Sequence, residues 1–354
     1  MPFSQENRKG TLNGIVFVAL FAAAATMISN ITMVKSLGIS PLVIGIVIGI
    51  FYANTLHNHI PSQWQGGITF SAKKILRFAI VFYGFRITFQ EIANVGMEGF
   101  LVSVIMLTTT FILGSYLGYK VFKMDRDTSM LTASGASVCG AAAVLATEPV
   151  LKAQGHQTAI AVSMVVLFGT VSMFLYPLLY ASIIEPSSGF LHLSPQEFGI
   201  YVGGTIHEVA QVVAVPASIM GASEEMANSA VIVKMTRVIL IAPMLIVLGM
   251  YLSYSSQRAG EQESRVPLVI PWFAVYFVGV AGFNSLGIVP TNVVAVINEI
   301  DTFLLTMAMT ALGMGTIFAK FKGLGLAPLY TAGAMFLWLV VGGFVVTKVI
   351  CGIF

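Results

Sequence analysis

Long apolar stretches alternate with short polar connections along this chain, and eleven of them approach the length of a membrane-spanning helix. About 20 residues of helix are needed to cross the roughly 30 Å hydrocarbon core of a bilayer. The pattern therefore predicts an all-α polytopic membrane protein with about 11 transmembrane helices. The expected spans are residues 12–33, 40–56, 67–89, 98–120, 129–148, 157–181, 197–218, 229–254, 267–288, 300–319 and 327–350.

The composition indicates the same class of protein. Of the 354 residues, 57% are hydrophobic and 9% are charged, whereas soluble domains have roughly 25% charged residues. The net charge of +3 is small and the basic residues form no patch, so nucleic acid is not an expected partner. Cys139 and Cys351 lie in apolar stretches, which indicates neither a disulfide framework nor a metal site. No cofactor is expected.

Basic residues are distributed unevenly around the expected spans. If the N-terminus is cytoplasmic, twelve lysines and arginines flank the inner ends and three flank the outer ends. This excess predicts a cytoplasmic N-terminus, with Ser36 outside and Ser187 inside, although the second or fifth stretch could instead be re-entrant. The inner residues are Arg8, Lys9, Lys73, Lys74, Arg77, Lys120, Lys123, Arg126, Arg258, Arg265, Lys320 and Lys322, and the outer ones are Lys35, Lys152 and Lys348.

Parts of the chain repeat at a constant offset. Gly84, Phe89, Gly96 and Gly114 recur 229 positions later as Gly313, Phe318, Gly325 and Gly343, and Pro41 and Asn54 recur after 230 as Pro271 and Asn284. Within a single transmembrane domain of residues 1–354, this predicts inverted repeats with halves of approximately 40–181 and 197–350. Chance coincidence of glycines is the alternative. A weaker echo at offset 71 links Thr158, Met164 and Tyr180 to Ser229, Met235 and Tyr251, and with eleven spans its two copies would run in the same direction.

Two of the expected spans contain small and polar residues that would interrupt a helix. The fifth carries the sequence SGASVCG at residues 134–140, and the seventh carries Gly203, Gly204 and Thr205. If each helix restarts there, Ser137 and Thr205 would be N-caps, and the half-helix N-termini would form an anion site. Alternatively, the small residues only allow neighbouring helices to pack closely.

Polar side chains next to the second interruption are candidates for transport chemistry. Ionisable groups at membrane depth are costly and usually functional. Glu208 could carry a proton, or it could only complete a capping box with Thr205. His207 and Gln211 are four residues apart, so they share one helical face.

A pair of basic residues in the eighth span could neutralise a bound anion or pair with Glu208. Lys234 and Arg237 are three residues apart, although Lys234 could instead extend to the outer interface. Arg86 is a weaker candidate, since it could only join helices. The predicted substrate site comprises Ser137, Val138, Cys139, Gly140, Gly204, Thr205, His207, Glu208, Gln211, Lys234 and Arg237.

The sequence does not favour an enzyme. His207 and Glu208 begin a run that resembles the zinc motif H-E-x-x-H, but Gln211 stands in place of the second histidine. An intramembrane serine protease could use Ser137 with His207, yet no third partner is recognisable.

Four segments of the chain are distinctive: SVCGA at 137–141, GTIHEVAQV at 204–212, VKMTR at 233–237 and TMAMTALG at 306–313. They resemble those of the YeiH-type family of proposed sulfate exporters of bacteria. The chain departs from the family pattern at Val138, at Ala141 with Ala142, and at 214–216. The resemblance implies a bacterial inner-membrane protein related to cation-proton antiporters, with crossed interrupted helices and an elevator-type movement.

The functional prediction is a secondary active transporter of a small anion, such as a sulfate-like oxyanion or an organosulfonate. The alternative is a cation antiporter in which Glu208 carries Na⁺ or H⁺ and no anion binds. The coupling ion, H⁺ or Na⁺, stays open. The lipid bilayer is an expected partner, and a homodimer is left open.

Overall fold

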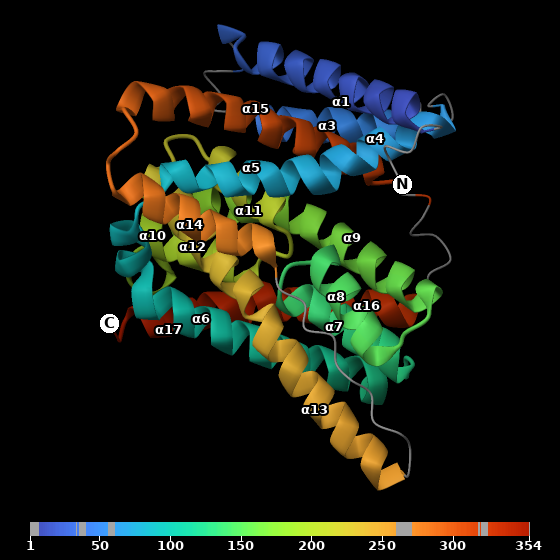
Figure 1. The fold of residues 1–354 in the computed structure, drawn as a ribbon. Coiled ribbons are helices and arrows are strands. Elements are labelled where there is room, and N and C mark those ends of the chain that lie inside the picture. Colours follow the sequence, from blue (N-terminus) through green and yellow to red (C-terminus); the bar gives the residue numbers. More distant parts are fainter. Residues whose placement is uncertain are drawn as a thin grey trace. The chain divides into compact units, whose positions relative to one another are not determined.

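The computed structural model describes residues 7–32, 34, 40–55, 61–259, 271–317, 319 and 325–353, and within them every regular element is a helix (Figure 1). The all-α class is therefore confirmed. Lys35, Ser36, Arg265, Phe318, Lys320 and Lys322 lie outside the described residues. The α-helices are α1 (Arg8–Ser29), α3 (Pro41–Thr55), α4 (Gln65–Phe70), α5 (Leu76–Tyr83), α6 (Phe89–Tyr116), α7 (Arg126–Ser137), α8 (Ala141–Leu151), α9 (Gly155–Leu179), α10 (Pro195–Thr205), α11 (Val209–Ala217), α12 (Glu224–Ile239), α13 (Ile241–Ala259), α14 (Trp272–Ser285), α15 (Thr291–Gly315), α16 (Leu326–Leu337) and α17 (Gly343–Cys351).

Short 3₁₀ and π segments extend several of these helices. The segments are Ser62–Trp64, Ser71–Ile75, Gly84–Arg86, Leu117–Val121, Tyr180–Ile184, Gly189–Leu191 and Trp338–Gly342. Together with them, six helical stretches are long and apolar enough to cross a membrane. They are Arg8–Ser29, Phe89–Val121, Gly155–Ile184, Glu224–Tyr254, Thr291–Gly315 and Leu326–Cys351. Three shorter apolar helices are α3, α8 and α14.

The chain divides into two compact units. Unit 1 contains α1, α3, α4, α5, α14 from Phe273 onward, and α15, with the first residues of α6 and of α12 and the last residues of α11. Inside it, α3 lies directly against α15 (Figure 1). Gly45 and Gly49 of α3 face Thr310 so closely that a side chain at either position would overlap α15. This is the small-residue contact by which membrane helices approach each other.

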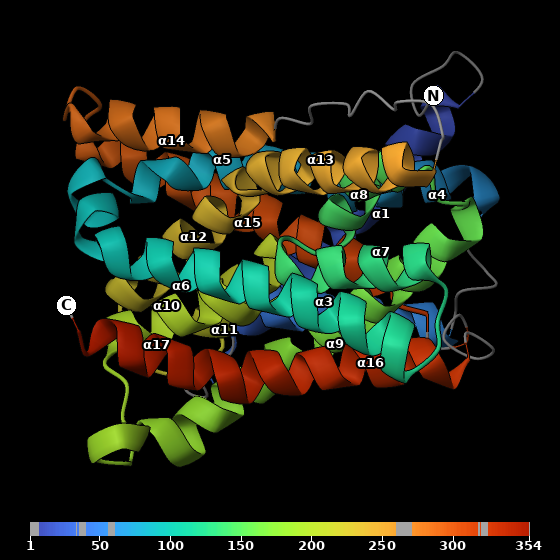
Figure 2. The same cartoon turned by 90° about the horizontal axis from the view of Figure 1, so that it is seen from below.

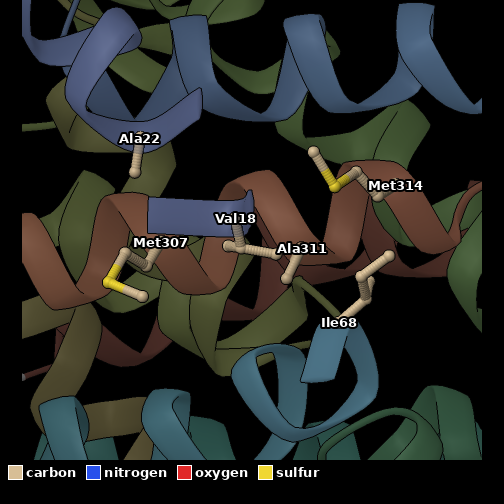
Figure 3. Close-up of a cluster of buried hydrophobic side chains, with 6 residues drawn as sticks. All are labelled: Val18, Ala22, Ile68, Met307, Ala311 and Met314. Atoms are coloured by element: carbon tan, nitrogen blue, oxygen red, sulfur yellow. The ribbon is translucent and has the colours of Figure 1, made fainter. Parts of the chain in front are cut away.

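An apolar cluster joins α1, α4 and α15 within unit 1. Met307, Ala311 and Met314 lie on one face of α15, because residues three and four apart share a face. Figure 3 shows them beside Val18 of α1 and Ile68 of α4. The contact explains why three helices from distant parts of the sequence form one layer.

Unit 2 is built on two long antiparallel stretches, α6 and α16 with α17, which also lie side by side in Figure 2. Near the end of α6, Gly114 meets Met335 of α16. Near its middle, Met106 meets Gly343 of α17. Unit 2 therefore has two ends. Helix α6 begins and α17 finishes at one of them, whereas α6 finishes and α16 begins at the other.

Helices α7 and α8 form a hairpin whose first arm begins, and whose second arm finishes, at the same end of unit 2. The Ser134 hydroxyl of α7 is 2.6 Å from the Thr147 hydroxyl of α8, so the two helices run side by side. At the base, Gln157 at the start of α9 donates to Asp125 just before α7, over 2.7 Å. Burial opposes ionisation of Asp125, but hydrogen bonds from Thr128 and Gln157 outweigh it and lower the pKa of this carboxyl.

Helices α10 and α12 run in the same direction within unit 2. The first turn of α10 begins at the opposite end from α7, where Glu197 pairs with Lys348 over 3.2 Å. Its last turn, at Gly204, packs on the same part of α6 as Val233 of α12. Helix α12 continues from Val233 to Arg237, which reaches the end of α7. The chain must therefore turn back between α10 and α12.

The helix interruptions predicted in the fifth and seventh stretches are observed, but their consequence is different. Each interruption is the tip of a hairpin. The first hairpin is formed by α7 and α8, and the second by α10 and α11, after which the chain turns back before α12. Residues 129–148 and 197–218 were expected to be interrupted spans, and neither runs straight through unit 2. For 129–148 this matches the re-entrant alternative that the sequence left open, whereas for 197–218 it was not expected. Because α8 runs back alongside α7, Lys152 at the end of α8 lies at the same end of unit 2 as Asp125.

Candidate functional site

The tips of the two hairpins are held together by Lys234 of α12. Its ammonium group donates to the Val138 carbonyl over 2.6 Å and to the Ile206 carbonyl over 2.7 Å. Val138 directly follows the last residue of α7, and Ile206 directly follows the last residue of α10. One lysine therefore binds the equivalent carbonyl of both hairpins.

Arg237 makes a second connection one turn further along α12. Its guanidinium donates to the carbonyls of Ser137 and Ala136 in α7 and, over 3.4 Å, to that of Gly203 in α10. Lys234 and Arg237 are both 0% exposed. Helix C-termini carry partial negative charge, and nearby cations stabilise them. The predicted extension of Lys234 to the outer interface is therefore wrong.

Ser137 and Thr205 end helices, whereas the sequence predicted that they begin them. The Ser137 hydroxyl donates back to the Ser134 carbonyl over 3.2 Å. The Thr205 hydroxyl donates to the Tyr201 carbonyl and accepts from Tyr176 over 2.9 Å. These bonds run to the preceding turn, so neither hydroxyl is an N-cap.

In each hairpin three residues separate the first helix from the second. Gly140 precedes α8 with φ of 74°, a conformation that residues with a side chain rarely adopt. Before α11, the backbone N–H of Glu208 donates to the Gln211 side chain over 3.1 Å. The capping interaction therefore links Glu208 with Gln211, and the expected capping box of Thr205 with Glu208 is wrong.

Glu208 also brings the two tips into direct contact. A side chain at Gly140 would have its Cβ 2.5 Å from the Cγ of Glu208, so the glycine leaves the space that this side chain occupies. Cys139, next to Gly140, is a buried free thiol. The carboxylate of one hairpin thus lies against the turn of the other.

Three buried nitrogen atoms at the tips have no hydrogen-bond partner. They are Nδ1 of His207, Nε2 of Gln211 and Nε of Arg237. His207 is 2% exposed and Gln211 is 0% exposed. Buried polar atoms without partners are rare and call for an explanation, such as a ligand. An arginine Nε and a glutamine Nε2 only donate, and one histidine tautomer also donates through Nδ1.

All the predicted site residues except one lie at the tips or on the turn of α12 that binds them. The exception is Gly204, which packs against Val102 of α6 and so has a structural contact. Their part in binding a substrate stays a prediction. Within the residues that the structure describes, no three His, Cys, Asp or Glu side chains are grouped to hold a metal ion.

A second buried charged group, in unit 1, was missed by the sequence analysis. Asp301 of α15 is 1% exposed and lies 3.4 Å from Arg86. The expected tenth span began at residue 300, which put Asp301 at its end. The helix in fact begins at Thr291, so Asp301 lies well inside it. An acidic residue within an apolar helix was the available signal.

Comparisons with known proteins find membrane proteins that are similar to this chain over nearly its whole length. A family model described as conserved hypothetical protein 698 matches residues 13–332. A UPF0324 membrane protein of Pseudomonas putida is 48% identical over 96% of this chain and 93% of its own length. The UPF0324 inner membrane protein YeiH of Escherichia coli K12 is 43% identical over 95% of this chain and 93% of its own. No solved structure matches the chain.

Proposed function

The chain belongs to the family of the UPF0324 membrane proteins, and from that premise we propose that it is a secondary active transporter of a small anion. The protein is thus a membrane protein. As in the relative named an inner membrane protein, its proposed location is the bacterial inner membrane, and its proposed activity is not enzymatic.

The observation that carries the proposal is the set of unpartnered nitrogens at the hairpin tips. Arg237 Nε and Gln211 Nε2 are buried donors, and His207 Nδ1 lies in the same tips. A site that presents donors and the positive charge of two buried cations favours an oxyanion over a cation. A sulfate-like oxyanion or an organosulfonate has several acceptor oxygens for such donors.

Reciprocal contacts support an inverted repeat at offset 229 to 230. In unit 1, Asn54 donates to the Thr316 carbonyl over 2.9 Å, and the matching Asn284 donates to the Ile87 carbonyl over 3.1 Å. Ile87 corresponds to Thr316 at an offset of 229, and Asn54 corresponds to Asn284 at an offset of 230. The donor and the acceptor of one bond therefore lie in opposite copies of the repeat from those of the other bond. In unit 2 the repeat likewise exchanges the Gly114–Met335 contact with the Met106–Gly343 contact. Such repeats are the usual basis of alternating access.

The weaker echo at offset 71 also fits an inverted repeat if α10 and α11 form a re-entrant hairpin and do not cross the membrane. It relates α9 to the stretch of α12 and α13, and the α10–α11 hairpin lies between them. Because that hairpin does not cross, α9 and α12 run in opposite directions. The two compact units supply the two bodies that an elevator-type movement needs, with both hairpins' tips in one of them.

The proposed topology has nine crossings and two re-entrant hairpins, with a cytoplasmic N-terminus. Lys152 then moves to the inner side, and the basic count becomes thirteen inside (12 + 1) and two outside (3 − 1). The nine-crossing arrangement thus follows the positive-inside rule better than eleven spans do.

This topology reverses the side expected for Ser187. In a chain with Cys139 and Cys351 replaced by alanine, Ser187→Cys should react with a membrane-impermeant maleimide from the periplasm. Lys152→Cys should react only after the membrane is permeabilised, because the α7–α8 hairpin returns it to the cytoplasmic side. Labelling of Lys152→Cys in intact cells would contradict the re-entrant hairpin.

Transport itself is tested by counterflow into proteoliposomes. Sulfate, sulfite, a taurine-like sulfonate and sodium would each be offered to the purified, reconstituted protein. Saturable counterflow of an anion supports the proposal. Sodium or proton exchange with no anion flux would replace it by the alternative, a cation antiporter, which the position of Glu208 against Gly140 favours.

Glu208→Gln should leave the fold intact and remove the pH dependence of transport. The fold is retained because the capping bond to Gln211 uses the backbone N–H of Glu208 and not its side chain. The pH dependence is lost because glutamine carries no titratable proton. Flux would be measured in proteoliposomes between pH 5.5 and 8.5, and an unchanged profile would make Glu208 a structural residue only.

A further inference from the structure

Helix α15 carries a buried acid that the proposed anion site does not use. Asp301 is the eleventh residue of the helix that begins at Thr291. Its Oδ2 atom lies 3.4 Å from an Arg86 nitrogen, whereas its Oδ1 atom is buried without a hydrogen-bond partner. Leaving a charged oxygen unpartnered in the interior is costly, so Oδ1 needs a partner that the protein groups do not supply.

A second oxygen of the same kind lies one turn earlier. The side-chain Oδ1 of Asn298 is also buried without a partner, while its backbone carbonyl accepts from Arg86 over 2.7 Å and from Thr302 over 2.8 Å. Residues three apart on a helix are neighbours, so Asn298 and Asp301 project from one face. Carboxylate and amide oxygens are the ligands that hard cations prefer.

The charges around this face favour a cation. Asp301, Glu91 and Glu224 all act electrostatically on Tyr83, and Arg86 is the basic group among them. Three carboxylates and one guanidinium therefore lie within electrostatic reach of Tyr83. Arg86 binds the other carboxylate oxygen, so it orients Asp301 without covering Oδ1. One carboxylate shared with an arginine suits a monovalent ion better than Ca²⁺, whose sites gather several carboxylates.

We propose that Asp301 Oδ1 and Asn298 Oδ1 bind a sodium ion on α15, with Arg86 as a positioning residue. The amide oxygen of Asn298 takes up no proton near neutral pH, which distinguishes this pair from a site for H⁺ alone. The binding site stands independently of the anion site. Its use as the coupling-ion site rests on the proposed transport function.

The test is the sodium dependence of thermal unfolding of the purified full chain in detergent. Sodium chloride would replace choline chloride at constant ionic strength, and the half-maximal concentration for stabilisation would be read for each variant. Asn298→Ala keeps the pair of Asp301 with Arg86 and should raise that concentration roughly tenfold. Asp301→Asn should abolish the dependence. Glu299→Gln, an exposed neighbour on the same helix, should leave it unchanged.

Three results would overturn the sodium site. They are an unaltered half-maximal concentration in Asn298→Ala, equal stabilisation by choline, and a stabilisation that follows pH with no effect of sodium. Sodium-dependent stability without any anion flux in proteoliposomes would instead contradict the proposed transport function and leave this site in place.

Discussion

Replacing Lys234 with methionine is expected to lower the free energy of unfolding by about 3 kcal/mol and to abolish transport. Methionine has a similar length but cannot donate, so the buried carbonyls of Val138 and Ile206 lose this donor. An unsatisfied buried polar group costs about 1 to 3 kcal/mol, and here there are two. Denaturant unfolding of the purified protein, followed by its helical circular dichroism, would measure the loss.

Lys120→Met is the matched control, because it removes the same charge from an exposed position. Its effect should stay within about 0.5 kcal/mol, as for most surface substitutions. If Lys234→Met unfolds at the same denaturant concentration as the wild type, the lysine does not hold the hairpin tips together.

Gly140→Ala is expected to destabilise the protein by about 3 kcal/mol and to block transport. The φ of 74° with ψ of −136° is a backbone conformation that residues with a side chain rarely adopt, and it would strain alanine by about 1 to 3 kcal/mol. The added Cβ would also lie 2.5 Å from Glu208 and 3.1 Å from Val165, and such overpacking costs about 1 to 3 kcal/mol. Thermal unfolding in detergent and counterflow of the reconstituted protein would measure both effects.

Gly155→Ala provides the control for this substitution. A Cβ at Gly155 meets no atom within 4 Å, so its stability should match that of the wild type. The double variant Gly140→Ala with Glu208→Ala removes the overlap and should recover part of the lost stability. If Gly140→Ala alone has the same stability and the same counterflow as the wild type, the close approach of Gly140 to Glu208 is not needed for folding or for transport.

The bonds of Arg237 change what can be expected of it as a ligand for the anion. From the sequence, Arg237 was a candidate either to neutralise a bound anion or to pair with Glu208. In the structure the terminal nitrogens donate to carbonyls of α7 and α10, and only Nε has no partner. Arg237 therefore contributes charge and one donor, while His207 and Gln211 supply the other free nitrogens.

The sequence was sufficient to predict the class of protein and the approximate positions of most of the apolar helices. An apolar stretch of about 20 residues can satisfy its backbone in a bilayer only as a helix, so length and hydropathy carry that information. The interruptions near Gly140 and Gly204 were visible for a similar reason, since glycines and hydroxyl residues cluster where helices break.

Caps and partners at the site could not be predicted from local patterns. Thr205 and Glu208 have capping-box spacing, yet the helix before the break continues through Thr205 because its hydroxyl bonds to the preceding turn. Lys234 and Arg237 were recognisable as costly buried cations, but nothing in their neighbourhood identified the carbonyls they bind. Those carbonyls lie 28 to 101 residues away in the chain.

The sequence by itself therefore determined that this is an all-helical membrane protein of a recognisable family, and which short segments carry its polar groups. The tertiary structure alone decided that the fifth and seventh segments turn back. Hydropathy is the same for a helix that crosses and for a hairpin of two short helices, so the direction after each break depends on long-range contacts. Here those contacts are the hydrogen bond between the hydroxyls of Ser134 and Thr147 and the hydrogen bonds that Lys234 donates to a carbonyl at each hairpin tip.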